Sequence, residues 1–364
     1  MRQRRASASA SAQSAGRTCP VFFLCTFCLL FLLWLLRPSS ASTTPLLTLG
    51  VIADVQYADA PSALSKMGVQ RHYRASLEVL RAAVTAWSSS SEQLSLLVNL
   101  GDAVDGREGA GAAVALQLVA TTLAQLQLPV HSVLGNHDLY HDGVTRTDWL
   151  THFAVTPAVS ASSRDHAYYS VQPVPEVRLI FLDCYEVAVI GRAAEDARSQ
   201  HAEALLALHN PRAVGNSRND PSALTGLQRR WVALNGAIGA EQLHWLREEL
   251  LTSRRSVQRV LIFSHVPLHP QAQSTMCAGM CVVWDYQEVL ELLKAFSDVV
   301  GACFAGHDHS GGQASENGIH FVTLQGVIES GVGVATFAEL KLYRRKALLR
   351  GHGRILSREL HFRT

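Results

Sequence analysis

The sequence predicts an α/β fold. Short apolar runs with the length of buried strands alternate along the chain with longer segments whose apolar residues recur at helical spacing. Most of these apolar runs end directly in clusters of Asp, Asn, Gln or His, several of them beside glycine. Functional sites in open α/β sheets form beyond the carboxyl ends of the strands. We therefore expect clusters that are far apart in the sequence to converge in space.

The predicted elements run through most of the chain. Strands are expected at 46–53, 94–100, 130–134, 177–182, 257–263, 300–305, 319–324 and 335–343. Helices are expected at 69–87, 112–126, 240–251 and 286–296. The stretch 183–239 is rich in Arg, Asn and Pro and weakly patterned. We interpret it as a long loop that shapes a pocket over the sheet.

Five polar clusters follow the predicted strands in order. They are Asp54-Val55-Gln56, Gly101-Asp102-Ala103-Val104-Asp105-Gly106, Gly135-Asn136-His137-Asp138, Ser264-His265 and Gly306-His307-Asp308-His309. Any one of them alone is more often a helix cap, a turn or a hydrogen-bond partner. Because each of the five directly follows a predicted apolar strand in the sequence, we interpret them as parts of one site.

The residue types in these clusters indicate a binuclear metal site. Two divalent ions about 3.5–4 Å apart can clamp a phosphoryl group and generate a hydroxide. Asp102 has the two oxygens and the full negative charge that a bridging ligand needs, and Asn136 offers a neutral carbonyl oxygen. The imidazoles of His265, His307 and His309 suit Mn, Fe or Zn. The chemistry favoured is phosphate-ester hydrolysis.

The ordered series Asp-x-Gln, Gly-Asp-x-x-Asp-Gly, Gly-Asn-His-Asp, His and Gly-His-Asp-His resembles the calcineurin-like metallophosphoesterase superfamily. That superfamily usually has His where this chain has Gln56. The Gln variant, together with segments 71–77 and 235–243, resembles one branch, the manganese-dependent ADP-ribose/CDP-alcohol diphosphatases. The resemblance covers residues from about 46 to the C-terminus. It implies a β-sheet sandwich flanked by helices, with the binuclear metal site at the strand ends.

The resemblance also implies a role for each matching residue. One ion would be held by Asp54, Gln56, Asp102 and His309, and the other by Asp102, Asn136, His265 and His307. His137 would contact the phosphate and protonate the leaving group, and Asp105 and Asp138 would orient their neighbours. An amide oxygen in place of an imidazole nitrogen tilts a site from Zn toward Mn or Mg. We therefore expect two divalent ions with Mn preferred, and Zn, Fe or Mg as alternatives.

The family resembled hydrolyses the diphosphate of ADP-ribose, CDP-choline and similar compounds to two phosphomonoesters. We expect a monomeric enzyme for such small molecules, and no nucleic-acid partner, because the net charge is only +2. One alternative is another binuclear-metal phosphoesterase, either a cyclic-nucleotide phosphodiesterase or a phosphomonoesterase. Another is a non-catalytic scaffold. The complete ligand set argues against the scaffold, and Gln56 with the two segments favours the diphosphatase.

Selectivity should come from residues around the metal site. The candidates for a nucleobase stack or a phosphate contact are Tyr57, Tyr73, Arg74, Tyr185 and Trp284. Cys277 and Cys281 are four residues apart, and we interpret them as part of a loop or a buried contact, not as metal ligands. The cysteines outside the N-terminal segment do not resemble a dense disulfide scaffold.

Residues 1–44 are expected to form a separate targeting segment, with the catalytic domain at 45–364. Residues 1–18 hold four Arg and no acid, and 21–36 is an unbroken apolar run that could contact a membrane. A signal peptide cleaved after Ala41 is the first interpretation, a signal-anchor the second, a mitochondrial presequence the third and an inactive extension the last. The charge asymmetry places the rest of the chain in the lumen or outside. The family resembled is cytosolic, and the chain lacks Asn-x-Ser/Thr acceptors.

Overall fold

The computed structural model describes residues 44–90, 93–140, 145–153, 166–213, 215–331 and 333–363. The predictions for the apolar run 21–36 and for cleavage after Ala41 lie outside these residues. Within the described ranges, no helix is both long enough and apolar enough to span a membrane.

Two six-stranded sheets carry the fold. The first has the order β14-β13-β12-β1-β4-β5, and the second has the order β10-β11-β9-β8-β7-β6. The strands of the first sheet are β1 (Leu47–Ile52), β4 (Leu96–Asn99), β5 (Val130–Ser132), β12 (Phe337–Leu342), β13 (Lys346–His352) and β14 (Arg358–His361). Those of the second are β6 (Tyr169–Val174), β7 (Val177–Phe181), β8 (Arg259–Phe263), β9 (Val300–Ala305), β10 (Gly312–Glu316) and β11 (Ile319–Thr323).

Parallel strands form the centre of each sheet. β1, β4 and β5 run parallel, as do β7, β8, β9 and β11, whereas β12 to β14, β6 and β10 pair antiparallel. The parallel strands read as near-continuous apolar runs because they are buried on both faces. One contiguous apolar core contains side chains of both sheets, such as Val98 on β4 and Phe263 on β8. The predicted sandwich is confirmed.

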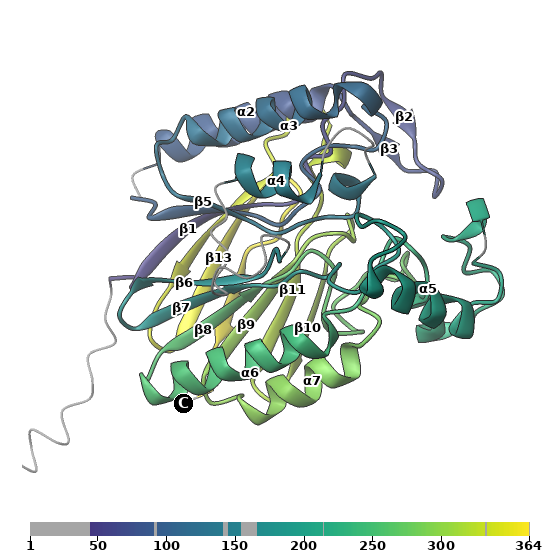
Figure 1. The fold of residues 1–364 in the computed structure, drawn as a ribbon. Coiled ribbons are helices and arrows are strands. Elements are labelled where there is room, and N and C mark those ends of the chain that lie inside the picture. Colours follow the sequence, from purple (N-terminus) through teal and green to yellow (C-terminus); the bar gives the residue numbers. More distant parts are fainter. Residues whose placement is uncertain are drawn as a thin grey trace, which may run out of the picture. The chain divides into compact units, whose positions relative to one another are not determined.

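Helices cover the two outer faces. Figure 1 shows α2 (Ala75–Ser88), α3 (Ala112–Ala124) and α4 (Arg146–His152) on one side of the sheets, and α6 (Gly239–Arg255) and α7 (Tyr286–Ala295) on the other. Trp87 of α2 packs against β1 so closely that a Cβ at Gly50 would lie 2.9 Å from its ring. The helices thus enclose both sheets and leave the carboxyl ends of the parallel strands for a site.

Several predicted elements need correction. The helix expected from residue 69 begins at Ala75, because residues 70–71 form the short strand β3 (Gln70–Arg71), which pairs with β2 (Ala63–Leu64). The expected loop 183–239 contains α5 (Ala197–His209), whose buried face consists only of Ser199, Ala202 and Leu206 and therefore lacks an apolar pattern. The antiparallel strands β6, β10, β13 and β14 were not predicted. Cys277 and Cys281 do lie in a loop, but they are joined by a disulfide.

Candidate metal centre

The seven predicted ligands lie together beyond the carboxyl ends of five strands. Asp54 and Gln56 follow β1, Asp102 follows β4, Asn136 follows β5, His265 follows β8, and His307 and His309 follow β9. All are buried except His307, which is partly buried. Residues as far apart in the sequence as Asp54 and His309 therefore meet in one place, as expected for side chains that follow the carboxyl ends of parallel strands.

Four of these residues form the first half of the cluster. Ligand atoms of Asp54, Asp102 and His309 all lie within 4.8 Å of one another. The Gln56 amide nitrogen lies 2.8 Å from Asp102 Oδ2 and 3.0 Å from His309 Nε2. The side-chain oxygen of Gln56 instead accepts a hydrogen bond from Arg71, at 3.2 Å. A half-turn of the amide would exchange its two atoms and bring the oxygen to the ligand position.

The second half of the cluster is built around Asn136. Its Oδ1 atom lies 2.9 Å from His307 Nδ1 and 3.3 Å from His265 Nε2. His265 Nε2 is also 3.4 Å from Asp102 Oδ2. The structure therefore places Asp102 between the two halves, where a carboxylate with two oxygens can face both.

Unusual backbone conformations aim these side chains. Asp54, Gln56, Asp102 and His307 have φ angles of +52°, +42°, +55° and +69°. A residue other than glycine rarely adopts this left-handed region, and each such residue costs about 1–3 kcal/mol. The turn after β5 is equally tight, because a Cβ at Gly135 would lie 2.0 Å from Asp102 Oδ1. Strain concentrated in the predicted ligands is typical of a functional site.

Each histidine of the cluster is oriented by its outer ring nitrogen. His265 Nδ1 lies 2.7 Å from the Leu100 carbonyl oxygen. His307 Nε2 lies 3.0 Å from Asn235 Oδ1, and His309 Nδ1 lies 3.1 Å from Glu329 Oε1. When the outer nitrogen donates to an oxygen acceptor, the inner nitrogen presents its lone pair to the cluster. Metal-binding histidines characteristically have this arrangement, so the residues fit divalent ions.

Neighbouring carboxylates and imidazoles shift each other's pKa values in the cluster. Burial acts to raise the pKa of Asp102, but His265 and His137 outweigh it and lower that pKa. Burial likewise acts to lower the pKa of His265, yet the charge of Asp102 and its hydrogen bond raise it to about 9. Asp54 and Glu329 raise the pKa of His309 to about 9 against the same effect. The carboxylates thus favour positive charge at these positions, which is the charge that a bound cation would supply.

His137 and two carboxylates border this cluster. His137 Nδ1 lies 3.2 Å from Asp105 Oδ2, and burial lowers the pKa of His137. Asp138 accepts hydrogen bonds from the backbone N–H groups of Gly135, Asp102 and Ala103 at 2.8–2.9 Å. The Gly106 N–H donates to His137 Nδ1 at 3.2 Å and so orients the ring, and Asp138 is placed to hold together the turns that carry Asp102 and Asn136.

Two cavities with shared lining residues open beside the cluster of predicted ligands, which we call the metal cluster. The smaller, of about 130 Å³, is lined by Gln56, Asp102, His307 and His309 among others. The larger, of about 860 Å³, adjoins it, and both share lining residues that include Arg71 and His137. Basic and aromatic side chains line the larger cavity; they are Lys66, Arg71, Arg107, Arg229, Tyr73 and Tyr140.

Of the residues predicted to contact the substrate, only Tyr73 lines the larger cavity. Tyr73 lines the larger cavity, with the Arg107 guanidinium 4.8 Å from its ring centroid. Tyr185 is buried beneath the cluster, where its hydroxyl lies 3.5 Å from Asn136 Oδ1. Arg74 points elsewhere: its side chain is 61% exposed and pairs with Asp59 at 2.6 Å. Tyr57 and Trp284 lie in apolar clusters.

Three residues at this site were missed by sequence reasoning. Arg71 lies in the same family-like segment as Arg74, and only β3 turns it toward the cavity. Asn235 lies in the second family-like segment and is wholly buried. The family-like segments 71–77 and 235–243 could therefore have pointed to Arg71 and Asn235 as site residues. Glu329, from the short 3-10 helix Val327–Glu329, had no such signal.

Comparison with known proteins finds similar phosphoesterases. The family model for calcineurin-like phosphoesterases matches residues 47–311. A manganese-dependent ADP-ribose/CDP-alcohol diphosphatase of Oryza sativa is 34% identical over 325 residues, which are 89% of this chain and 96% of that protein. The Homo sapiens protein of the same name is 32% identical over 335 residues, with 89% and 95% covered. A crystal structure of a dimetal phosphatase from Danio rerio is 34% identical, with a TM-score of 0.80. The match covers 88% of this chain and 100% of that chain.

The fold, the site and these matches define the class: the chain is a calcineurin-like phosphoesterase with the metallophosphoesterase fold. Within that class the chain belongs to the manganese-dependent ADP-ribose/CDP-alcohol diphosphatase family.

Proposed function

We propose that the protein is a metal-dependent hydrolase that cleaves the diphosphate bond of ADP-ribose, CDP-choline and related nucleoside diphosphate compounds. The products are AMP or CMP and a second phosphomonoester. The observation that best supports this is that the metal cluster opens into a cavity of about 860 Å³ lined by cationic and aromatic side chains. Cations suit a diphosphate, aromatic rings suit a base or ribose, and the volume is typical of a small-molecule site.

The proposed ligand sets follow the two halves of the cluster. Asp54, Gln56, Asp102 and His309 would hold one ion, and Asp102, Asn136, His265 and His307 the other. When bound, the ions polarise a phosphoryl oxygen and lower the pKa of a coordinated water to near neutrality. Mn is the preferred metal, because Gln56 supplies oxygen where imidazole would favour Zn. Zn, Fe and Mg are the alternatives.

The chain's own residues bind the substrate and move a proton. Arg71 lies 3.9 Å from Asp105 Oδ2, and it lines both cavities. A half-turn of the Gln56 amide, which brings its oxygen to the metal, would also release the Arg71 N–H that this oxygen now accepts from and leave that donor for a phosphate. His137, whose Nδ1 atom accepts a hydrogen bond from the Gly106 N–H, faces the same cavity and could protonate the leaving oxygen through Nε2.

Replacing Arg71 with alanine should raise KM for ADP-ribose by about tenfold to a hundredfold, because a charge-assisted hydrogen bond contributes about 1.5–3 kcal/mol. Arg74→Ala is the matched control: it removes the same group three residues away, from a side chain that faces solvent. Steady-state kinetics of both variants with Mn check this. Similar KM values for Arg71→Ala and wild type, or an equal loss in Arg74→Ala, would contradict the role of Arg71.

The competing functions are other phosphoesterases. Purified protein should be assayed with Mn against ADP-ribose, CDP-choline, cyclic AMP and an aryl phosphate, with the products separated by chromatography. The proposal predicts that the two diphosphates have the highest kcat/KM and yield AMP and CMP. Preference for cyclic AMP would indicate a cyclic-nucleotide phosphodiesterase, and preference for the aryl phosphate a phosphomonoesterase. No turnover of any substrate would leave the scaffold alternative.

Residues 1–44 are proposed to direct the catalytic domain, 45–364, into the secretory pathway or to anchor it to a membrane. The support is the apolar run at 21–36, the Arg residues before it, and the Cys277–Cys281 disulfide, which fits an oxidising compartment.

A C-terminal tag should therefore be protected from protease in intact microsomes and digested once detergent is added. A variant without residues 1–44 is the control and should be cytosolic. A tag that is digested without detergent, or a full-length chain found wholly in the cytosol, is the opposite result.

A further inference from the structure

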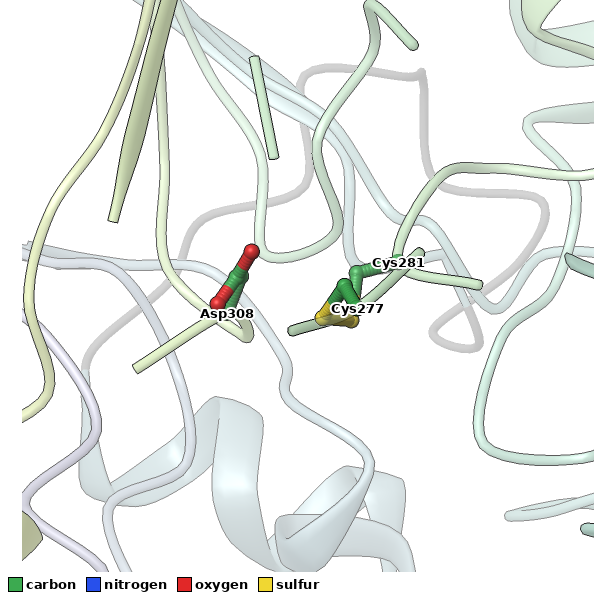
Figure 2. Close-up of side chains that lie close together, drawn as sticks. All are labelled: Cys277, Cys281 and Asp308. Atoms are coloured by element: carbon green, nitrogen blue, oxygen red, sulfur yellow. A yellow bond between two sulfur atoms is a disulfide. The ribbon is translucent and has the colours of Figure 1, made fainter. Parts of the chain in front are cut away.

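A disulfide-closed loop forms part of the cavity wall beside the metal cluster. Cys277 and Cys281 are bonded, with Cα atoms 5.6 Å apart, and both are buried. Together with Met276 and Met280 they line the smaller cavity, which several of the predicted metal ligands also line. Figure 2 shows the joined sulfur atoms close to Asp308, which lies between His307 and His309. The proposed mechanism leaves this bond without a role.

One chain of hydrogen bonds leads from the loop to His307. The Met280 carbonyl, inside the disulfide ring, accepts a hydrogen bond from Asn235 Nδ2 at 2.6 Å. The other end of that amide, Oδ1, lies 3.0 Å from His307 Nε2. Asn235 is wholly buried, so bulk solvent does not compete for either contact. The Met280 carbonyl, together with the Arg230 carbonyl that accepts from the same Nδ2 at 2.9 Å, therefore sets the orientation of Asn235 and, through it, the direction in which His307 Nδ1 points.

A second chain leads from the same loop to Asp308. The Cys277 N–H donates to Ser274 Oγ at 3.4 Å. The Ser274 hydroxyl and backbone N–H both donate to the Asp308 carboxylate, at 3.0 Å and 2.5 Å. Two further N–H groups of the loop, from Gly279 and Cys281, donate to Gln273 Oε1 at 3.1 Å each. The loop is thus hydrogen-bonded to the turn that carries His307 and His309 in two ways, through Ser274 to Asp308 and through Asn235 to His307.

The loop backbone depends on its closure. Ala278 and Gly279 have φ angles of +49° and +91°, and the first is unfavourable for alanine. A Cβ at Gly279 would lie 2.3 Å from the Gly226 carbonyl oxygen, so the loop presses closely on its neighbour. A bond between residues 277 and 281 limits the conformations open to this segment, and without it the segment would gain alternatives.

We propose that the Cys277–Cys281 disulfide is a redox-sensitive positioning element for the metal-binding turn His307–His309. With the bond intact, Met280 holds Asn235 against His307 and the cavity wall is complete. A dithiol reductant transfers two electrons and two protons: the S–S bond breaks, two S–H bonds form, and the reductant becomes a disulfide. The loop then relaxes, and both Mn affinity and substrate affinity fall. The inference rests on the proposed function for its metal.

The test compares metal binding by the full chain in the two redox states. Calorimetric Mn titration is performed on oxidised protein and on protein reduced with dithiothreitol and then freed of it without oxygen, with the bond followed by thiol alkylation and mass spectrometry. Reduction should weaken Mn binding by about tenfold, the lower range for loss of an outer-sphere partner. The double variant Cys277→Ser/Cys281→Ser should bind Mn as weakly as reduced wild type, and dithiothreitol should not change it further.

Cys303→Ala is the matched control, because Cys303 is a free buried cysteine on β9 and its variant should keep the full response to reductant. The proposal is overturned by Mn dissociation constants within twofold in oxidised and reduced wild type, or by a double variant that still responds to dithiothreitol. If the double variant does not fold, the wild-type comparison decides alone. Hydrolysis of ADP-ribose by the oxidised enzyme is measured in parallel. Its absence would refute the proposed function, while the Mn titration would still judge the disulfide.

Discussion

Asp102→Asn is expected to lower kcat/KM for ADP-ribose by about a thousandfold or more, which corresponds to about 4 kcal/mol of transition-state stabilisation. Asp102 is buried, and its carboxylate lies 3.4 Å from His265 Nε2 and 2.8 Å from Gln56 Nε2, so it faces both halves of the cluster. An amide keeps the shape of the side chain but removes the negative charge and one of the two acceptor oxygens. Two cations could then no longer be held close together.

The size of this loss separates a bridging role from a lesser one. Asp298→Asn is the matched control, because that side chain is 56% exposed, pairs with Arg254 and precedes the amino end of β9, whereas the cluster lies beyond the carboxyl ends of the strands. It should retain wild-type kinetics. Calorimetry should show weaker binding of both Mn ions by Asp102→Asn. Activity of this variant within about tenfold of wild type would be incompatible with a bridge.

His137→Ala should slow the cleavage of poor leaving groups much more than that of good ones. A general acid contributes about 10²–10⁴ in rate, and more when the departing oxygen is more basic. A diphosphate expels a phosphomonoester whose pKa is about 6, whereas an alkyl phosphodiester expels a far more basic alkoxide. His137 is suited to this role because its Nδ1 atom accepts a hydrogen bond from the Gly106 N–H at 3.2 Å, and the residue lines both cavities.

The comparison needs two substrates and one control. The ratio of kcat/KM between wild type and His137→Ala should be measured with Mn for ADP-ribose and for an alkyl diester. We expect the larger ratio for the diester. His361→Ala, which removes an imidazole that is 74% exposed, should leave both substrates unaffected. Equal ratios for the two substrates would make His137 a phosphate-binding residue and not a proton donor.

The strand-end clusters could be predicted because each one is local. The run that ends at Asp54 and the run that ends at His307 each show an apolar strand followed by polar residues, and parallel strands bring such ends together. The parts that escaped prediction depend on contacts across the chain. Asn235 lies 72 positions from His307, and nothing in the sequence pairs them. Cys277 and Cys281 are close in sequence, but a loop does not reveal whether its sulfur atoms meet.

Burial and pairing also explain the errors in the fold. α5 faces the rest of the protein with three small or isolated side chains, and the antiparallel strands β6, β10, β13 and β14 carry polar residues, so neither has the apolar pattern of the central strands. Arg74 was a candidate for phosphate binding, yet only the pairing of β2 with β3 decides that Arg71 faces the cavity. Side-chain direction in short strands depends on tertiary pairing more than on local sequence.

The most direct measurement of the central claim is anomalous X-ray scattering at the manganese edge from crystals soaked in Mn. Two peaks about 3.5–4 Å apart are expected. One should lie among Asp54, Gln56 and His309, the other among Asn136, His265 and His307, with Asp102 between them. A single peak, or two peaks outside this cluster, would contradict a binuclear centre built from these seven residues.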